Sequence, residues 1–590
     1  MGRAMGGGEG RRCAGPRPRR SLGIVCQRGP ASPGKKRSNA GARPSREEIL
    51  AACITASAAS RTPPTCRPGN PSLAGAARSR HASCVNPLSR RSLLKGLVAV
   101  SACHGARLLG ATAASAARLP RATPERHGVS SAGLLALVDA LDRLEHVHGL
   151  MVLRHGHVLA EGWWAPYDAA TPHELYSLSK SFTSTAVGLA VADGKLSVDD
   201  PVLRHLQDEA PSDPSSNLKS MRVRDLLTMT TGHQTEPPSA PDKMTARSFL
   251  ATPVPFKPGT HFLYNTPATF MQSALVQKVT GKTVHEYLKG RLLGPLGIEG
   301  STWDSNVEGV NLGGYGLRLR TEDVARFGQL LLRGGRGPSG KALVPAAWVE
   351  AATSRQVSNG SNPRSDWDQG YGFQFWRCRH GAYRGDGAFG QFCIVLPAQD
   401  MVVAVTAGLG DMQAVLDRVW ENVLPAVGRD GRKARHALRD RLEGLAIKTV
   451  QGARTSPKAA SVLGRTFKLA PNAAGWESVR LEERAGGGWD LSWVARGRET
   501  RLPCGHGRWA KGEGALAVSP RTGPGPLPAE PMATSGGWTS DDTFSATVHV
   551  CSTPFRALMT MRAVEAGLRM ELRTPLGFGA QVPVQMQSEG

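Results

Sequence analysis

The hydrophobic positions from residue 131 onward switch repeatedly between helical and strand spacing. The segment AGLLALVDALDRLE, which begins at Ala132, carries apolar residues three to four positions apart and predicts a helix. The following GLMVLRHGHVLAEGWW alternates like a β-hairpin that turns near His155 and Gly156. After Ser177 the spacing is helical again, and Asp193-Gly194 is a typical helix end. Residues 118–430 are therefore expected to form a domain that mixes helices with strands.

The last third of the chain has a different pattern. Residues 431–460 are basic and polar, and we expect them to begin as a short helix and to end as a linker. From residue 461 to 585 short alternating runs, such as WDLSWVARG and TFSATVHV, are separated by Gly-rich turns. This pattern predicts an antiparallel β domain of about 120 residues, either a barrel or a sandwich.

The first 84 residues have almost no periodic apolar pattern. They are rich in Gly, Pro, Arg, Ser and Ala, a composition that cannot bury a core and predicts disorder. The composition of the sequence changes after residue 84, which suggests that translation starts at Val85 and that residues 1–84 are an untranslated extension. Peptides from residues 1–84 in a digest of the natural protein would overturn this start.

Residues 85–117 have the features of an export signal. Arg90 and Arg91 precede a weakly apolar stretch, and small residues such as Ala114-Ser115-Ala116 follow it, an order that resembles a twin-arginine signal. We therefore expect a periplasmic or extracellular protein. Two alternatives stay open: a basic, Ala-rich linker, and a lipoprotein cleavage box that ends at Cys103.

Charge and composition exclude several other classes. The net charge is +25, but residues 1–84 alone hold 16 Lys and Arg against 3 Asp and Glu, and no basic stripe with interleaved aromatic residues follows. A nucleic-acid partner is therefore not expected. No apolar run approaches the ~20 residues of a membrane span. No metal-site spacing occurs, so neither a metal nor a cofactor is expected, and Cys378 and Cys393 are either a pair or two buried thiols.

One Ser-x-x-Lys pair stands where nucleophilic catalysis is feasible. The chain has four such pairs, and only Ser177 and Lys180 lie at the predicted start of a buried helix. A serine hydroxyl attacks a carbonyl once a neighbouring base takes its proton, and lysine serves if burial and the helix N-terminus disfavour its charged form. The free N–H groups of a first helical turn also suit an oxyanion.

Two later segments offer partners for this pair. Tyr264 stands on a loop just before a helix, where a phenol is able to relay a proton, although a core tyrosine fits the same pattern. In RGDGAFGQ, glycines open a strand-like run, which is typical of close backbone approach to a ligand or of a glycine-bulged edge strand. The N–H of Ala388 is a candidate second oxyanion donor beside that of Ser177.

Several motifs together resemble the serine β-lactamase-related hydrolases, in the branch of class C β-lactamases, D-Ala-D-Ala peptidases, esterases and the 6-aminohexanoate-dimer hydrolase. The resemblance covers roughly residues 130–425, and its motifs occur in family order: YSLSKSFTS, LLTMTTGH, FLYNT, PLGIEGSTW, TEDVARFGQLLLRGG, WVEAAT, YGFQFW and GDGAFGQ.

The resemblance implies a fold and a set of roles. The fold would be a β-lactamase-like α/β sandwich with an all-helical subdomain, and the site would lie between these two parts. Ser177 would be the acylated nucleophile, Lys180 its base and Tyr264 the second proton-transfer residue. Gly387 to Gln391 would stand where the family's Lys-Thr-Gly or His-x-Gly strand lines the pocket.

The chain also departs from the family pattern. It contains no Lys-Thr-Gly, and its second motif has Asn265 and Thr266 after Tyr264 in place of Tyr-x-Asn. The order Tyr-Asn-Thr and the Gly-Gln end of GDGAFGQ are more similar to the esterase and amide-hydrolase members. By this resemblance, Asn265 would face the substrate. Trp376 is either a pocket wall or a core residue.

These observations predict a serine hydrolase that cleaves an ester or amide bond of a small molecule or short peptide through an acyl-enzyme. One alternative is a β-lactamase or D-Ala-D-Ala carboxypeptidase. The other is a peptide- or cell-wall-binding protein that keeps the scaffold without the activity.

Overall fold

The computed structural model describes residues 118–517 and 527–589. The predicted extension, the twin-arginine-like segment and the alternative lipoprotein box lie outside these residues.

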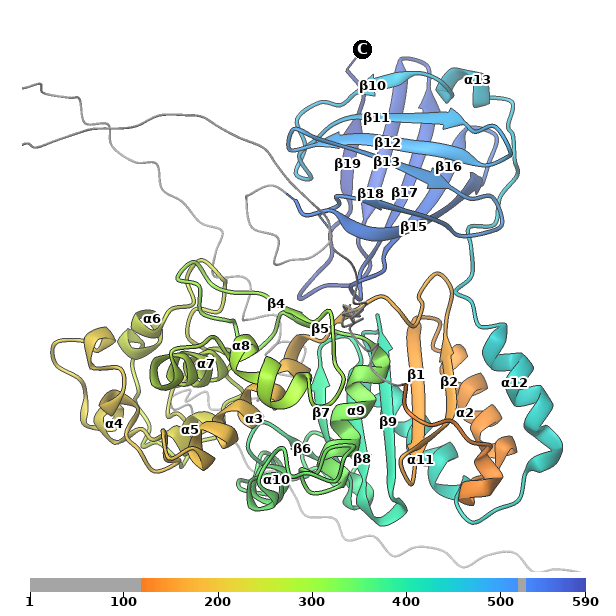
Figure 1. Ribbon diagram of the computed structural model, residues 1–590. Coiled ribbons are helices and arrows are strands. Elements are labelled where there is room, and N and C mark those ends of the chain that lie inside the picture. Colours follow the sequence, from red (N-terminus) through yellow and green to blue (C-terminus); the bar gives the residue numbers. More distant parts are fainter. Residues whose placement is uncertain (1–117, 518–526, 590) are drawn as a thin grey trace, which may run out of the picture. The chain divides into compact units, whose positions relative to one another are not determined.

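A six-stranded antiparallel sheet forms the centre of the first domain, with the strand order β2-β1-β9-β8-β7-β6. Every residue of β8 and β9 is buried, which requires a covering layer on both faces of the sheet. Helix α9 packs against β8, β9 and β1, while α2 and α11 pack together on the other side (Figure 1). The strands and these helices are β1 (Val147–Arg154), β2 (His157–Trp163), β6 (Trp376–Arg377), β7 (Tyr383–Gly387), β8 (Gln391–Leu396), β9 (Met401–Ala407), α2 (Ser131–Asp142), α9 (Thr321–Leu332) and α11 (Met412–Ala426).

The local predictions around this sheet are confirmed. The predicted helix is α2, and the predicted hairpin is β1–β2, in which Arg154 pairs with His157 across the turn at His155 and Gly156. The helix expected after Ser177 is α3 (Ser179–Ala192), which ends at Asp193 before Gly194 in a left-handed conformation.

The segment between β3 and α9 contains more helix than strand and lies on the β7 side of the central sheet (Figure 1). Helix α3 packs against α7 and α8, and α7 also contacts α5 and α6. A small sheet with the order β3-β5-β4 lies beside them. The elements of this helical subdomain and of the small sheet, besides α3, are α4 (Ser216–Ser220), α5 (Val223–Leu227), α6 (Ala246–Ala251), α7 (Thr266–Thr280), α8 (Val284–Leu288), β3 (His173–Glu174), β4 (Thr302–Trp303) and β5 (Leu317–Leu319). Helix α10 (Ala346–Thr353) follows α9 in the chain.

The segment predicted as a linker contains α12 (Arg435–Glu443), which packs on α2 and β2. Arg441 of this helix donates hydrogen bonds to Asp139 and Asp142 of α2. This part of the segment therefore adds an outer layer to the first domain, and we call the elements from α2 to α12 the α/β domain.

The C-terminal part is a β-barrel of two antiparallel sheets, one of the two forms that the pattern predicted (Figure 1). One sheet has the order β10-β11-β12-β13 and the other β14-β15-β16-β17-β18-β19. Backbone hydrogen bonds join β10 and the residues after it to β19 and the residues that follow it, and Gly505, after β13, joins β15, so the two sheets are connected on both sides. The strands of this barrel domain are β10 (Thr466–Lys468), β11 (Trp476–Glu483), β12 (Trp489–Ala495), β13 (Arg498–Cys504), β14 (Ala510–Gly514), β15 (Glu530–Trp538), β16 (Thr543–Val550), β17 (Arg556–Val564), β18 (Gly567–Arg573) and β19 (Val584–Gln587).

The α/β domain and the barrel domain belong to the same compact unit and share a buried, polar contact. Tyr167 stacks on His148 with ring centroids 3.6 Å apart, and its hydroxyl hydrogen-bonds Nδ1 of His549 on β16 at 3.0 Å. His148 in turn lies 3.1 Å from His173, nitrogen to nitrogen. Burial lowers the pKa of His173 to about 4, and it holds the pKa values of His148 and His549 well below the usual range.

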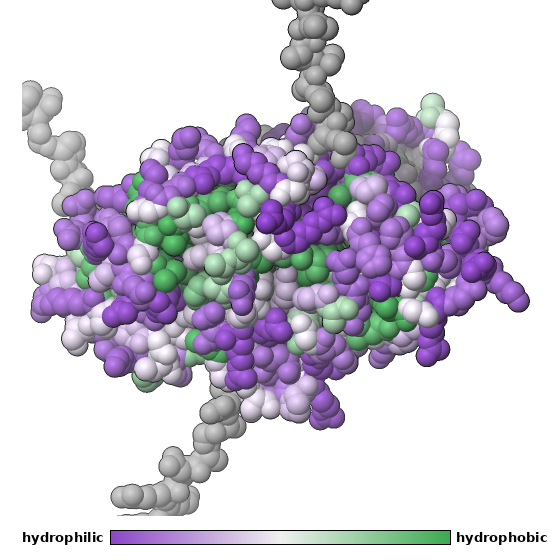
Figure 2. Space-filling view, turned by 60° about the horizontal axis from the view of Figure 1, so that its bottom comes forward, coloured by the Kyte–Doolittle hydropathy of each residue, from purple (hydrophilic) through white to green (hydrophobic). Residues whose placement is uncertain are grey.

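The face of the molecule in Figure 2 is mostly hydrophilic, with groups of hydrophobic residues between the hydrophilic ones. Among the described residues no helix combines the length and the apolar character that crossing a bilayer requires.

These histidines predict that the domain contact weakens in mild acid. In the unfolded chain a histidine has a pKa of 6.5, whereas in the folded protein the pKa of His173 is about 4. Stability from this cluster is therefore complete above about pH 6.5 and is lost as the pH falls toward 4. We expect the Tm to fall between pH 7 and pH 5, and the variant His549→Asn to show a smaller fall.

The matched control for this measurement is His436→Asn, because His436 lies exposed on α12. Its Tm should follow the parent at every pH. An equal fall of Tm in the parent and in His549→Asn would contradict a role for the buried cluster.

Candidate active site

The predicted nucleophile lies in a tight turn between a strand and a buried helix. Ser177 is the middle residue of the 3-10 turn η3 (Tyr176–Leu178), and α3 begins directly after it. Tyr176 has a φ of +47°, in the left-handed region that costs an ordinary residue about 1–2 kcal/mol. Such an outlier persists only where its surroundings hold it, which makes the turn a constrained place for Ser177.

Lys180, one helical turn further on, reaches back to this serine. Its Nζ lies 3.3 Å from Oγ of Ser177, and the side chain is only 1% exposed. The same Nζ donates to the backbone oxygen of Gly314 at 2.8 Å and lies 3.4 Å from Oγ1 of Thr266. The amine is thus fixed from two other segments of the chain and points at the hydroxyl of Ser177.

The second motif brings an aromatic wall to the same amine. The ring centroid of Tyr264 lies 5.2 Å from Nζ of Lys180. This ring stacks on Trp376 of β6 with centroids 5.3 Å apart, and the edge of Tyr371 closes the group. Tyr264 therefore lies beside the Ser/Lys pair, and Trp376, at 8% exposure, lies behind Tyr264.

Asn265 has a structural role in this motif. It is the N-cap of α7, where its Oδ1 accepts from the N–H of Ala268 and its Nδ2 donates to Oγ1 of Thr231. The side chain is fully buried. Both ends of the Asn265 amide are therefore engaged within the protein, and the side chain that faces Lys180 is that of the next residue, Thr266.

Three contacts of the site were missed by the sequence analysis: those of Thr266, Gly314 and Glu236. Glu236 accepts a hydrogen bond from the N–H of Thr266 at 2.8 Å, which fixes the start of α7. A Cβ at Gly314 would lie 2.7 Å from Cγ2 of Thr266 and 3.1 Å from Nζ of Lys180. Only glycine fits there, and the GGYG run at residue 313 was the available signal for it.

The glycines of β7 allow the strand to lie directly against the turn of Ser177. A Cβ at Gly387 would lie 1.9 Å from the backbone oxygen of Leu175 and 3.1 Å from the backbone nitrogen of Ser177. A Cβ at Gly385 would lie 2.5 Å from Leu178 and from Oγ of Ser181. The close approach inferred from these glycines is present, and it brings the end of β7 next to the backbone nitrogen of Ser177, with Ala388 as the residue that follows the strand.

Gln391 connects the turn after β7 to the middle of the sheet. Its Nε2 donates to the backbone oxygens of Ala388, at 3.2 Å, and Ala407, at 2.7 Å. Its Oε1 accepts from the N–H of Ala407 at 3.3 Å. The side chain is fully buried and fixes the turn that holds Ala388.

Arg384 and Asp386 point into the protein and bind each other. Arg384 is fully buried and donates to Oδ2 of Asp386 at 2.9 Å and to the backbone oxygen of Asp366 at 2.7 Å. Its guanidinium also lies 4.4 Å from the ring centroid of Trp367 and 5.7 Å from that of Trp376. This group supports the wall behind Tyr264.

The described cysteines are free and buried: Cys378, Cys393, Cys504 and Cys551. Of the two readings for Cys378 and Cys393, buried thiols apply, and burial raises the pKa of Cys393 to about 12. Within the described ranges no three His, Cys, Asp or Glu side chains gather in a way that would hold a metal ion.

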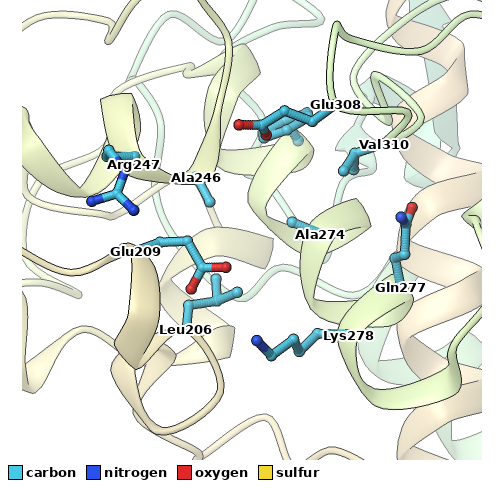
Figure 3. Close-up of a pocket in the computed structure, with 10 residues that line it drawn as sticks. Leu206, Glu209, Ala246, Arg247, Ala274, Gln277, Lys278, Glu308 and Val310 are labelled. Carbon is cyan, nitrogen blue, oxygen red and sulfur yellow. The ribbon is translucent and has the colours of Figure 1, made fainter. Parts of the chain in front are cut away.

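A pocket of about 330 Å³ lies elsewhere, between α6, α7 and the loop before β5 (Figure 3). Its lining is mixed in charge and includes the acidic residues Glu209 and Glu308 and the basic residues Arg247 and Lys278. None of the residues predicted for catalysis lines it. The pocket and Lys180 lie at different turns of α7. The first residue of this helix, Thr266, contacts the amine of Lys180, and later turns of the helix line the pocket.

Comparison with known proteins agrees with this architecture. Residues 131–421 match the model of the beta-lactamase family. A 6-aminohexanoate-dimer hydrolase of Paenarthrobacter ureafaciens is 28% identical over 354 residues, which is 55% of this chain and 89% of that protein.

Two solved structures are similar as well. A penicillin-binding protein homologue from Caulobacter crescentus is 17% identical, with a TM-score of 0.42, over 51% of this chain and 99% of its own. An octameric penicillin-binding protein homologue from Pyrococcus abyssi is 15% identical, with a TM-score of 0.41, over 77% of this chain and 100% of its own.

Residues 131–421 thus form a domain of the beta-lactamase family, a family of hydrolases, and the barrel domain follows it. The family that the sequence motifs resembled is therefore confirmed, and so is the fold that the resemblance implied.

The contact between β7 and the turn of Ser177 predicts that Gly387→Ala is damaging. A methyl group 1.9 Å from the backbone oxygen of Leu175 forces the strand away from the turn. A displacement of about 1 Å at a reacting centre costs about 10²-fold in rate. We expect hydrolysis of a model ester, measured as kcat/KM, to fall by about that factor.

The matched control is Gly410→Ala, because a Cβ at Gly410 meets nothing within 4 Å. Its kcat/KM should stay within about twofold of the parent. Equal activities of Gly387→Ala and Gly410→Ala would contradict the importance of this approach.

Proposed function

We propose that this protein is a serine hydrolase that cleaves an ester or amide bond of a small substrate through an acyl-enzyme. The observation that carries the proposal is the distance of 3.3 Å between Nζ of the buried Lys180 and Oγ of the partly exposed Ser177. A lysine that is 1% exposed beside a serine at the start of a helix matches the needs of nucleophilic catalysis.

In this mechanism Lys180 acts as the base in its neutral form. A neutral amine has two N–H bonds, and the backbone oxygen of Gly314 and the hydroxyl of Thr266 are placed to accept them. The nitrogen lone pair is then available for the proton of Ser177. Loss of hydration on burial favours the neutral form of an amine in general.

The reaction then proceeds in two stages. Oγ of Ser177 attacks the substrate carbonyl carbon while its proton moves to Lys180, and the N–H groups of Ser177 and Ala388 stabilise the oxyanion. Tyr264, beside Lys180, passes a proton to the leaving alcohol or amine as the carbon–heteroatom bond breaks, and it regains a proton from Lys180. Water then attacks the acyl carbon and gives a proton to Lys180. This proton returns to Oγ of Ser177 as the acyl–oxygen bond breaks, and the acid product leaves.

The substrate is proposed to be a linear ester or amide and not a β-lactam. Thr266 replaces the asparagine of the Tyr-x-Asn motif, and the strand at Gly387 lacks Lys-Thr-Gly. The likeness to a 6-aminohexanoate-dimer hydrolase over 89% of that protein supports the same substrate class. We further propose export through the twin-arginine-like segment at Arg90 and Arg91.

A fluorophosphonate probe tests the nucleophile. We expect one phosphonyl adduct on the folded protein, located at Ser177 by peptide mass spectrometry and absent from Ser177→Ala. Lys180→Met should slow labelling by about 10²–10⁴-fold, because general-base catalysis contributes that much.

Ser216→Ala is the matched control, since Ser216 and Lys219 form the other Ser-x-x-Lys pair of the described chain, on the exposed side of α4. This variant should label like the parent. A folded parent that takes up no probe would contradict the proposed activity and would favour a binding protein on the same scaffold.

A substrate panel tests the bond that is cleaved. We expect kcat/KM to be at least about tenfold higher for short p-nitrophenyl esters and linear 6-aminohexanoate amides than for nitrocefin or a D-Ala-D-Ala peptide. The reason is that Thr266 and the strand at Gly387 lack the groups that hold β-lactams and terminal carboxylates. Faster turnover of nitrocefin or of the D-Ala-D-Ala peptide would reverse this assignment.

A further inference from the structure

Two residues next to the proposed oxyanion donors have a strained backbone. Tyr176 precedes Ser177 and has a φ of +47°, and Phe389 follows Ala388 and has a φ of +69°. The left-handed region favours glycine, and an aromatic side chain enters it at a cost. Both donors are therefore attached to residues whose conformation must be maintained by other parts of the protein.

The side chains that surround these two residues come from the barrel domain. Tyr176 and Phe389 contact each other edge to face, with ring centroids 5.4 Å apart. Phe555 lies 6.1 Å from Tyr176 and 5.3 Å from Phe389, and Phe578 lies 5.9 Å and 4.8 Å from the same two rings. We call these four side chains the aromatic clamp.

The buried rings of the clamp belong to the core of the barrel. Tyr176 and Phe389, although part of the α/β domain, are packed in the same hydrophobic cluster as Phe555 and the barrel interior. Tyr176 and Phe555 are fully buried and Phe389 is 7% exposed. Phe555 precedes β17, and Phe578 lies between β18 and β19, so two barrel loops reach the site together.

Backbone contacts fix one of these loops against the α/β domain. The N–H of Glu174, at the end of β3, donates to the backbone oxygen of Ser552 at 2.8 Å. A Cβ at Gly408 would lie 2.4 Å from the backbone oxygen of Pro554, so the loop passes directly over the end of β9. The N–H of Leu409 donates to the backbone oxygen of Phe389 at 3.0 Å. The barrel loop at residues 552–554 is therefore in contact with the end of β3 and with the residue that follows β9, and the next residue, Leu409, binds Phe389.

We propose that the barrel domain is a positioning element of the active site, and that Phe555 and Phe578 hold Tyr176 and Phe389 in the conformations that aim the N–H groups of Ser177 and Ala388 at the oxyanion. This inference rests on the proposed serine hydrolase function. It assigns to the barrel a role in transition-state stabilisation. An oxyanion donor interacts more strongly with the transition state than with the substrate carbonyl, so a misaligned donor lowers kcat more than it changes KM.

The test uses the full-length protein with Phe555→Ala and Phe578→Ala, each with its Tm and circular dichroism spectrum recorded. We expect kcat for a p-nitrophenyl ester to fall at least about tenfold in each variant, with KM within about twofold of the parent. Phe555→Leu and Phe578→Leu fill most of the space and should recover most of the lost kcat. Phe578 is only half-buried, so Phe578→Ala provides the measurement if Phe555→Ala does not fold.

Phe544→Ala is the control for a loss of barrel stability alone. Phe544 is a fully buried barrel aromatic that packs on Trp489 and Trp538 and is not part of the clamp. It should lower the Tm while kcat stays within about twofold of the parent. If the clamp variants change kcat no more than Phe544→Ala, or change KM in place of kcat, the inference is wrong.

The parent protein separates this inference from the proposed function. A parent that neither labels at Ser177 nor hydrolyses esters would contradict the serine hydrolase itself. An active parent whose clamp variants remain fully active would contradict only the role of the barrel.

Discussion

The end of strand β7 lies so close to the turn of Ser177 that no side chain fits between them. This is the constraint on which the rest of the candidate site depends. A Cβ at Gly387 would lie 1.9 Å from the backbone oxygen of Leu175, so the two backbones are in direct contact. The contact sets the position of Ser177 relative to Ala388, and it joins the helical subdomain, which begins at α3, to the central sheet.

Lys180 depends on an equally close packing on its other side. Its Nζ is surrounded by the turn of Ser177, the start of α7 and the GGYG loop, three segments that are far apart in the sequence. A buried amine in this position is costly unless hydrogen-bond acceptors replace its water. Gly314 and Thr266 supply two acceptors, and the absence of a side chain at Gly314 leaves room for the amine. Burial of the Lys180 amine and its orientation toward Ser177 thus have one structural cause.

The sequence predicted the parts of the site that local spacing determines. Ser177 and Lys180 are separated by one helical turn, and Gly385 and Gly387 of β7 are two residues apart, so their patterns are visible in a single segment. Gly314 and Glu236 were missed because their contacts with Lys180 and Thr266 exist only after folding. Asn265 shows a different difficulty, because an asparagine before a helix fits both a substrate contact and an N-cap. In the structure its side chain accepts a hydrogen bond from the N–H of Ala268 and caps α7.

Contacts that exist only after folding also explain why the sequence predicted a β domain but not its packing against Tyr176 and Phe389. The alternating runs after residue 461 predict strands, yet Phe555 and Phe578 lie in loops, where single aromatic residues carry no periodic signal. Their partners Tyr176 and Phe389 stand about 380 and 170 residues earlier in the printed sequence. A left-handed aromatic residue is unfavourable in an isolated segment, so the conformation of the turn cannot be a local property. It follows that the domain which supplies the packing has to be considered together with the residues that it holds, because Tyr176 and Phe389, on either side of the candidate site, pack in the hydrophobic core of the barrel.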